Sequence, residues 1–425
     1  MSFPITYWYG IRKEFLSKER LMEAKEAGFN LIECAYDPET NKQVLAWCEE
    51  LGLKANVQDP RMDIALAGND GWEAALDNMI ADYKGCKAVN RFFMRDEPVD
   101  EYFPVLGRVA RYLHEHDPDH GEYVNFLPHH AVPQIEGMDM FARYNLHMDR
   151  YISEVNPSLL SYDHYSLSFR QVDDLSGKKP ARLSEENLKR NGWENRLHEA
   201  VDGKGFYDNL MLVRNKAAEI GVPWMSIILL VEHWHYRWPT EGEVRWEAFT
   251  AFSHGVSALS YFTYWTPGTA HTEPWSYHNG IILSDGTRGE KYEIVKAINA
   301  DLQSLYAGLE APLHGVTPED PHKSIAVYHT GKEADALAAP FAPFAKLKDI
   351  TTPEGAVPRT VVGVFGDGNR FTVVNKDYDA PVAIRFSTAD AVPLWHWSKA
   401  HYAWEVCTDD FSIAPGDGEL FAFSL

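Results

Sequence analysis

Three acidic residues close apolar stretches of the chain, where a carboxyl group can act on a bound molecule. Glu97 ends the stretch AVNRFFMRDE, Glu232 ends VPWMSIILLVE, and Asp163 follows SLLSY. Cleavage of a glycosidic bond needs two carboxyls, because one gives a proton to the leaving oxygen while a charged one attacks or shields the sugar carbon. We expect Glu97 to be the acid/base and Glu232 the nucleophile, with Asp163 as the rival second carboxylate.

Pro98, the residue after Glu97, restricts the backbone conformation of Glu97 and so the direction of its side chain. Pro98 disfavours the helical region for the residue before it, so the strand should stay extended through Glu97 and direct its carboxyl outward. The motif Asp96-Glu97-Pro98 is weak by itself, since acidic residues often precede proline at strand ends. Its place after the apolar run FFM favours the catalytic interpretation.

The chain is rich in aromatic residues, at 13%, and many of them fall where strands end. Aromatic faces pack in cores, and exposed ones also stack on the apolar faces of sugar rings. We expect the substrate to contact these aromatic residues and a few polar neighbours of the carboxyl pair: Tyr7, Trp8, Asp96, Asp163, His164, Tyr165, Trp234, Tyr236, Tyr264, Trp265, Trp275 and Tyr277.

The elements that must position these residues alternate along the first 310 residues. Eight short apolar strands each precede an amphipathic helix, which predicts an α/β protein with a parallel sheet closed into a (β/α)₈ TIM barrel. An open doubly wound sheet usually carries a glycine-rich phosphate turn after its first strand. Residues 10–13 read Gly-Ile-Arg-Lys instead, which argues against that alternative.

The pattern changes at two places. A charged insertion of about 35 residues, roughly 169–203, separates the sixth strand from the sixth helix, and loops of such length are often functional. A Pro-rich linker at 311–324 then leads to residues 325–425, where short strands between Gly, Asp and Asn turns predict a small, sandwich-like all-β C-terminal domain.

The amino-acid composition limits the kinds of molecule that the protein can bind and the compartment in which it is expected. Lys and Arg total 40 against 62 Asp and Glu, a net charge of −22, which disfavours nucleic acid and anionic membrane surfaces. Four scattered cysteines form neither a disulfide framework nor a thiolate zinc motif. The first residues lack a secretory signal and no run of 18 apolar residues occurs, so we expect a cytoplasmic protein. Nothing in the sequence specifies a homo-oligomer.

The order of these features resembles that of the clan A retaining glycoside hydrolases, and more closely bacterial endo-β-1,3-glucanase-like barrels and their uncharacterised relatives. The resemblance covers most of residues 5–310 and extends to the C-terminal APGDGELFAFSL. It rests on EAGFNLIE, RDEPVDEYFPVLGRVARYLHEHDP, LLSYDHYSL and YRWPTEGEVRWEAFTAFSHGVSALSYFTYW.

The resemblance implies an O-glycoside hydrolase that cleaves β-bonds of a glucan-type or related oligosaccharide by retaining double displacement. It places the acid/base after strand four, at Glu97, and the nucleophile at the end of strand seven, at Glu232. It implies no metal and no cofactor. Asp96 departs from the pattern, because an Asn that contacts the sugar 2-hydroxyl usually stands there.

Two other functions fit the residues. A metal-dependent barrel hydrolase would use ligands at strand ends, namely Asp59, His129, His130, Asp163, His164, His233 and His235. A non-catalytic carbohydrate-binding barrel would keep its affinity for sugar after Glu97 is replaced.

Overall fold

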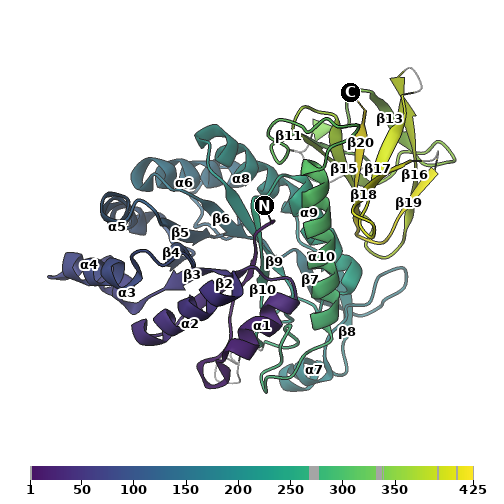
Figure 1. Cartoon of the computed structure of the whole chain (residues 1–425). Helices are drawn as coiled ribbons and strands as arrows, with labels where there is room; N and C mark the ends of the chain where they lie inside the picture. Colours follow the sequence, from purple (N-terminus) through teal and green to yellow (C-terminus); the bar gives the residue numbers. More distant parts are fainter. Residues whose placement is uncertain are drawn as a thin grey trace.

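The computed structural model describes residues 2–267, 277–331, 337, 339–389, 392–407 and 410–424. Eight parallel strands form one sheet (Figure 1). Their spatial order is β1 (Ile5–Tyr7), β10 (Ala258–Phe262), β9 (Trp224–Leu229), β6 (Leu160–Asp163), β5 (Gly121–Phe126), β4 (Val89–Asp96), β3 (Lys54–Gln58) and β2 (Leu31–Ala35).

The two ends of this sheet meet through Asn30, which directly precedes β2. The amide Oδ1 of Asn30 accepts a hydrogen bond from the backbone N–H of Ile5 at 2.8 Å, and the backbone N–H of Asn30 donates to the Ile5 carbonyl at 3.2 Å. The sheet is thereby a nearly closed barrel, which confirms the predicted TIM-barrel fold.

Helices follow the strands and cover the outside of the barrel. The longer ones are α1 (Lys18–Glu26), α2 (Pro38–Leu51), α3 (Pro60–Ala67), α4 (Trp72–Tyr83), α5 (Phe103–His116), α6 (Met140–Val155), α8 (Phe206–Ile220), α9 (Glu241–Ser253) and α10 (Lys291–Glu310). Two 3₁₀ turns are η1 (Lys13–Phe15) and η2 (Asp100–Tyr102). No helix in the described ranges has both the length and the apolar character needed to cross a bilayer.

Helix α3 was not expected from the sequence, and it changes the interpretation of Asp59. Asp59 caps the helix by accepting a hydrogen bond from the backbone N–H of Arg61 at 2.9 Å, and Pro60 occupies the first turn. Its carboxylate also receives the guanidinium of Arg61 at 2.7 Å. Asp59, named above among potential metal ligands, is therefore engaged as a helix cap.

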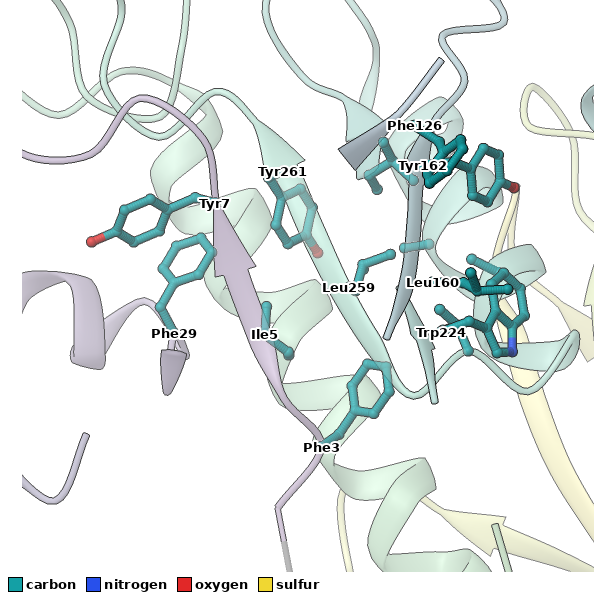
Figure 2. Packing of buried hydrophobic residues seen from close by; sticks show 14 of the residues in the cluster. Phe3, Ile5, Tyr7, Phe29, Phe126, Leu160, Tyr162, Trp224, Leu259 and Tyr261 are labelled. Atoms are coloured by element: carbon teal, nitrogen blue, oxygen red, sulfur yellow. The ribbon is translucent and has the colours of Figure 1, made fainter. Parts of the chain in front are cut away.

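The strands are nearly continuous apolar runs because both of their faces are covered. All six residues of β9 are buried. Figure 2 shows the resulting packing, in which Ile5 and Leu259 come from neighbouring strands and the rings of Tyr7 and Phe29 pack edge-on.

The insertion after β6 is ordered as a hairpin with one helix. Strand β7 (Leu167–Val172) pairs antiparallel with β8 (Leu197–Asp202), and α7 (Glu185–Asn191) lies between them in the chain. The long loop expected at about 169–203 therefore has secondary structure of its own.

The C-terminal region is all-β. Its larger sheet has the order β12 (Ala339–Pro340), β11 (Ser324–His329), β14 (Thr360–Phe365), β15 (Arg370–Asn375), β20 (Gly418–Phe423), β17 (Leu394–Ser398) and β18 (Ala403–Val406). The smaller sheet has the order β13 (Leu347–Thr351), β16 (Val382–Thr388) and β19 (Asp410–Ile413). Side chains of both sheets share one apolar core, which fits the predicted sandwich.

This β region packs closely on the barrel's outer helices, and in Figure 1 it lies against α9 and α10. Helix α9 has ten buried residues, which is typical of a helix enclosed on all sides. A β-carbon on Gly363 in β14 would lie 2.1 Å from the carbonyl oxygen of Ser253, so the two backbones meet where only glycine fits.

Candidate active site

A pocket of about 250 Å³ opens at the C-terminal ends of the barrel strands, the end at which barrel enzymes carry their active sites. Its polar lining comes from adjacent strands β4, β5 and β6, and its aromatic lining comes mainly from the segments after β1, β6 and β10. The lining residues are Trp8, Tyr9, Asp96, Glu97, Asn125, Asp163, Tyr165, His233, Phe262 and Tyr277.

Asn125 organises the carboxyls of this pocket from the middle strand of the three. Its Nδ2 donates hydrogen bonds to Oδ1 of Asp96 at 3.0 Å and to Oδ1 of Asp163 at 2.9 Å. Its Oδ1 accepts from the hydroxyl of Ser161 at 3.1 Å, which sets the orientation of the amide. The two aspartates are thus held at fixed positions on either side of β5.

Glu97 directly follows β4 and turns into the same cluster. Its backbone N–H donates to the Asn125 carbonyl at 2.8 Å, and its carboxyl shares a hydrogen bond with that of Asp163. Glu97 has φ of 45°, in the left-handed region, whereas Pro98 led us to expect an extended residue. The extended expectation was wrong: the chain turns sharply here, and such strain in non-glycine residues is typical of functional sites.

The surroundings raise the pKa of all three acids. Burial, and then the charge of Asp96, raise the pKa of Glu97 to about 7. Burial, and then the charges of Glu97 and Asp96, raise the pKa of Asp163. Burial also raises the pKa of Asp96. Asp163 is 5% exposed, whereas Asp96 and Glu97 face the solvent of the pocket mouth. A proton is therefore retained on the Glu97–Asp163 pair close to neutral pH.

Glu232, the predicted nucleophile, is not among the residues that line this pocket. It lies three residues beyond β9 and is fully buried. Its carboxylate accepts hydrogen bonds from the backbone N–H of Ser184 at 3.0 and 3.1 Å and from the amide of Asn187 at 2.8 Å. Ser184 is the N-cap of α7, so Glu232 neutralises the start of that helix and fastens the insertion to the barrel.

This environment predicts a mainly structural role for Glu232. Glu232→Gln would remove the charge at the start of α7 and place an amide N–H₂ against donors, so we expect the free energy of unfolding to fall by about 1–3 kcal/mol. Turnover should stay near that of the wild type. Chemical denaturation followed by fluorescence, together with rate measurements, checks both expectations.

Glu185→Gln is the matched control for that substitution, because Glu185 begins the same helix and is exposed. Equal stability of the two variants would contradict the anchoring role of Glu232. A loss of turnover by several orders of magnitude in Glu232→Gln, with stability unchanged, would restore Glu232 as the nucleophile.

The structure places the other predicted binding residues in three settings. Trp8, Asp96, Asp163, Tyr165 and Tyr277 line the pocket. Tyr7, Tyr264 and Trp265 are in the core at 0–1% exposure, where Tyr7 stacks on Tyr264 with ring centroids 4.4 Å apart. The expectation that these three aromatic residues contact the substrate was therefore wrong, because they pack in the core.

The remaining predicted residues that the structure describes are not among those that line the pocket. Tyr236 packs edge-on against the pocket residue Tyr165, with ring centroids 5.5 Å apart. Trp234 is 46% exposed and packs on His235. His164 is buried among other histidines and away from the pocket lining. Trp275 falls outside the described residues.

Three lining residues were not found from the sequence: Tyr9, Asn125 and Phe262. Asn125 left a usable signal, since it is the polar residue in the otherwise apolar segment YVNFL. Tyr9 and Phe262 left none, because an aromatic residue next to a barrel strand packs in the core as readily as it lines a pocket.

A larger hollow of about 690 Å³ adjoins the pocket and shares Trp8 and Tyr9 with it. Its lining includes Glu33 in the middle of β2, which accepts hydrogen bonds from the amide of Asn56 at 3.0 Å and the hydroxyl of Thr6 at 3.4 Å. Burial raises the pKa of Glu33 to about 8, which favours the neutral form of this acid near pH 7. The two hollows adjoin at Trp8 and Tyr9.

The candidate metal ligands do not assemble into one centre. His233 lines the pocket and stacks on Tyr277 with centroids 5.2 Å apart, and Asp163 is held by Asn125. Among the described residues, the metal-type grouping is formed by His129, His130 and His164. The Asp and His set of the metal-hydrolase alternative is therefore divided among at least three places: the start of α3, the pocket and the group of three histidines.

Comparison with solved structures supports the fold. The chain is 9% identical to a catalytic mutant of Gan42B, a GH42 β-galactosidase from G. stearothermophilus, over 100% of this chain and 98% of that one, with a TM-score of 0.55. It is 11% identical to a family 39 glycoside hydrolase from the gut symbiont Bacteroides cellulosilyticus WH2, over 99% and 81%, with a TM-score of 0.51.

The chain spans 61% of the β-galactosidase of the psychrophilic Marinomonas ef1, at 12% identity and a TM-score of 0.48. No protein-family model matches the sequence, and no curated protein matches it. At these identities the likeness establishes the TIM-barrel fold of glycosidases. The nearer resemblance to clan A and to endo-β-1,3-glucanase-like barrels stays a prediction.

Proposed function

We propose that the protein is a glycoside hydrolase that acts on a β-linked oligosaccharide. The observation that carries the proposal is the contact between the carboxyls of Glu97 and Asp163 in a solvent-open pocket at the barrel mouth. Aromatic walls beside that pair, including Trp8 and Tyr277, suit the apolar faces of a sugar ring. The fold shared with glycosidases agrees with this assignment.

Glu97 is the proton donor in this proposal. Its raised pKa keeps a proton available for the leaving glycosidic oxygen, and its place at the mouth lets that oxygen approach. After the first step the ionised Glu97 removes a proton from the attacking water. Asp96 supports the first role, because its charge helps to raise the pKa of Glu97.

Asp163 replaces Glu232 as the proposed nucleophile. Asn125 directs one oxygen of Asp163, and the contact with Glu97 occupies its free side until a substrate enters. A sugar carbon between the two acids would separate them, and retaining enzymes hold such a pair about 5–5.5 Å apart. The proposed course is therefore retention through a glycosyl ester on Asp163.

The adjoining hollow favours an oligosaccharide over a single sugar. The inner pocket of about 250 Å³ suits one ring, and the hollow of about 690 Å³ extends from it past Trp8 and Tyr9. The net charge of −22 disfavours polyanionic chains at long range. A neutral, glucan-type or related oligosaccharide meets these conditions, and cytoplasmic action on imported fragments remains part of the proposal.

The pH dependence of kcat/KM should reflect the carboxyl pair. The donor form of Glu97 is lost as pH rises through its pKa of about 7, so the rate should fall about tenfold per pH unit above that value. On the acidic side the rate should rise as Asp163 ionises, above the ordinary range of an Asp because its pKa is raised. A profile flat from pH 6 to 9 would contradict the role of Glu97.

The test of the function is a screen of defined β-linked oligosaccharides with products followed by NMR. We expect hydrolysis of at least one neutral β-oligosaccharide, with the β-anomer of the product formed first. Initial release of the α-anomer would contradict the retaining mechanism and indicate an inverting one. Binding of oligosaccharides without hydrolysis of any would favour the non-catalytic carbohydrate-binding alternative.

A further inference from the structure

Aromatic side chains continue from the candidate active site into the hollow beside it. The hollow of about 690 Å³ has Trp8 and Tyr9 in common with the inner pocket of about 250 Å³. Phe93, also in its lining, packs edge-on against Trp8 with ring centroids 5.5 Å apart, and Tyr9 is 42% exposed. Aromatic residues of this kind suit the apolar face of a sugar ring. Because Trp8 and Tyr9 line both cavities, a ligand held in the inner pocket can extend along them into the hollow.

Strands β2 and β3 bring polar side chains to the same hollow. Glu33 and Ala35 are two residues apart on β2, so their side chains share one face of the strand. Their parallel partners on β3 are Asn56 and Gln58. Glu33, Ala35 and Gln58 all line the hollow, and the short side chain of Ala35 leaves Glu33 accessible from it.

The two carboxyl oxygens of Glu33 have different surroundings. Oε1 accepts hydrogen bonds from Nδ2 of Asn56 at 3.0 Å and from the hydroxyl of Thr6 at 3.4 Å. Oδ1 of Asn56 accepts from Nδ2 of Asn90 at 2.8 Å, which leaves the donor side of the Asn56 amide for Glu33. Oε2 receives no hydrogen bond from the described residues and is not one of the buried polar atoms that lack a partner. One oxygen therefore holds the carboxyl in place, and the other is available to a ligand in the hollow.

The charges of the lining favour an uncharged ligand. Arg12 pairs with Glu14, and Lys13 pairs with Asp37 at 2.5 Å. Among the described residues the lining thus holds no unpaired cation that would select an anionic sugar. Burial raises the pKa of Glu33 to about 8, and the neutral acid that this favours near pH 7 suits a hydroxyl group better than an ammonium group.

We propose that the hollow is a second sugar-binding subsite, which takes a neutral sugar residue next to the one held in the inner pocket, and that Oε2 of Glu33 hydrogen-bonds a hydroxyl of that residue. The inference rests on the proposed glycosidase function and adds the residue that recognises the neighbouring sugar. The amide of Gln58 lies in the same lining and can bond a second hydroxyl. Glu33 takes no part in the proton transfer or the attack assigned to Glu97 and Asp163.

The experiment measures by calorimetry how tightly neutral β-linked trisaccharides bind, each compared with its own monosaccharide. The probes are the trisaccharides of glucose, galactose, mannose and xylose. The full-length protein carries Glu97→Gln in every titration, so that the probes are not consumed. We expect at least one trisaccharide to bind about tenfold or more tightly than its monosaccharide, because it gains the aromatic contact and the hydrogen bond of the hollow.

Adding Ala35→Leu should remove that advantage and leave monosaccharide binding unchanged, because the larger side chain fills the space in front of Glu33. Ala67→Leu is the matched control, since Ala67 is an exposed alanine at the end of α3 and does not line the hollow. It should keep the full advantage of the trisaccharide.

Two substitutions of Glu33 separate its hydrogen bond from its bulk. Glu33→Gln keeps an acceptor for Asn56 and presents an N–H to the hollow, so trisaccharide affinity should stay within about threefold of the parent value. Glu33→Leu should weaken it about tenfold, because an apolar group then faces the sugar hydroxyl. If Glu33→Leu fails to fold, Ala35→Leu still decides the outcome, since Ala35 is exposed.

Trisaccharides that bind no more tightly than their monosaccharides would overturn the proposal, as would an Ala35→Leu variant that keeps the full advantage. Equal losses in Glu33→Gln and Glu33→Leu would overturn the role of Glu33. None of these titrations depends on hydrolysis. Failure of the glycosidase proposal would instead be seen as absence of turnover in the wild type, whatever the trisaccharide affinities.

Discussion

Glu97→Gln is expected to lower kcat on a natural β-linked oligosaccharide by about 10²–10⁴-fold, because the amide cannot protonate the leaving oxygen. On aryl glycosides whose phenol leaves without a proton, the first step should proceed at nearly the wild-type rate. Comparison of the two substrate types in stopped-flow and steady-state assays measures this difference.

Asp100→Asn provides a control for Glu97→Gln that alters an acid in the next turn of the chain. Asp100 is bound by Arg143 and Arg150 and is absent from the residues that line the pocket. Its substitution should affect stability and leave the ratio of the two substrate types unchanged. Equal losses on both substrate types in Glu97→Gln would show that Glu97 does not act as the proton donor.

Asp163→Gly is expected to reduce turnover roughly 10³-fold or more on all substrates, because the carboxylate that attacks the sugar carbon is removed. Added azide should restore turnover of activated aryl glycosides by entering the vacated space. The product should be the α-glycosyl azide, since azide attacks from the side that Asp163 held. Product analysis by NMR checks the configuration.

Glu232→Gly, assayed in the same way, separates the two candidates for the second carboxylate. If Glu232 only fastens α7, azide should restore nothing, and the loss should follow from reduced stability. Formation of the α-azide by Glu232→Gly and not by Asp163→Gly would return the nucleophile to the position predicted from the sequence.

The sequence predicted the fold because buried parallel strands leave continuous apolar runs. The runs before Glu97, Asp163 and Glu232 correctly indicated strands whose ends face the barrel mouth. The expectation that Tyr7 contacts the substrate was wrong because side chains alternate between the two faces of a strand. Tyr7 and Trp8 are neighbours and point to opposite sides, so they could not both face the substrate.

The position of the Glu232 carboxylate depends on contacts with residues that are distant in the sequence, so it could not be predicted from the sequence. The chain continues for three residues after β9, pairs with His278, and meets α7 from an insertion about 45 residues earlier. The insertion was expected to be a loop, so a buried Glu232 was expected to pair with Arg237 or His233 and not with the start of α7. Asn125 was overlooked for a related reason, since its value lies in touching Asp96 and Asp163 from two other strands.

The close seat of the C-terminal sheet on α9 has a consequence for how the chain holds together. Val361, Val374 and Leu420 belong to the same apolar cluster as the barrel interior, and Gly363 meets Ser253 backbone to backbone. A chain cut near residue 310 would expose apolar side chains of α9 that are now buried, so we expect it to be less stable than the whole chain. Because the two regions share this packing, we expect the barrel and the β region to unfold in one transition even though residues 311–324 link them in the chain.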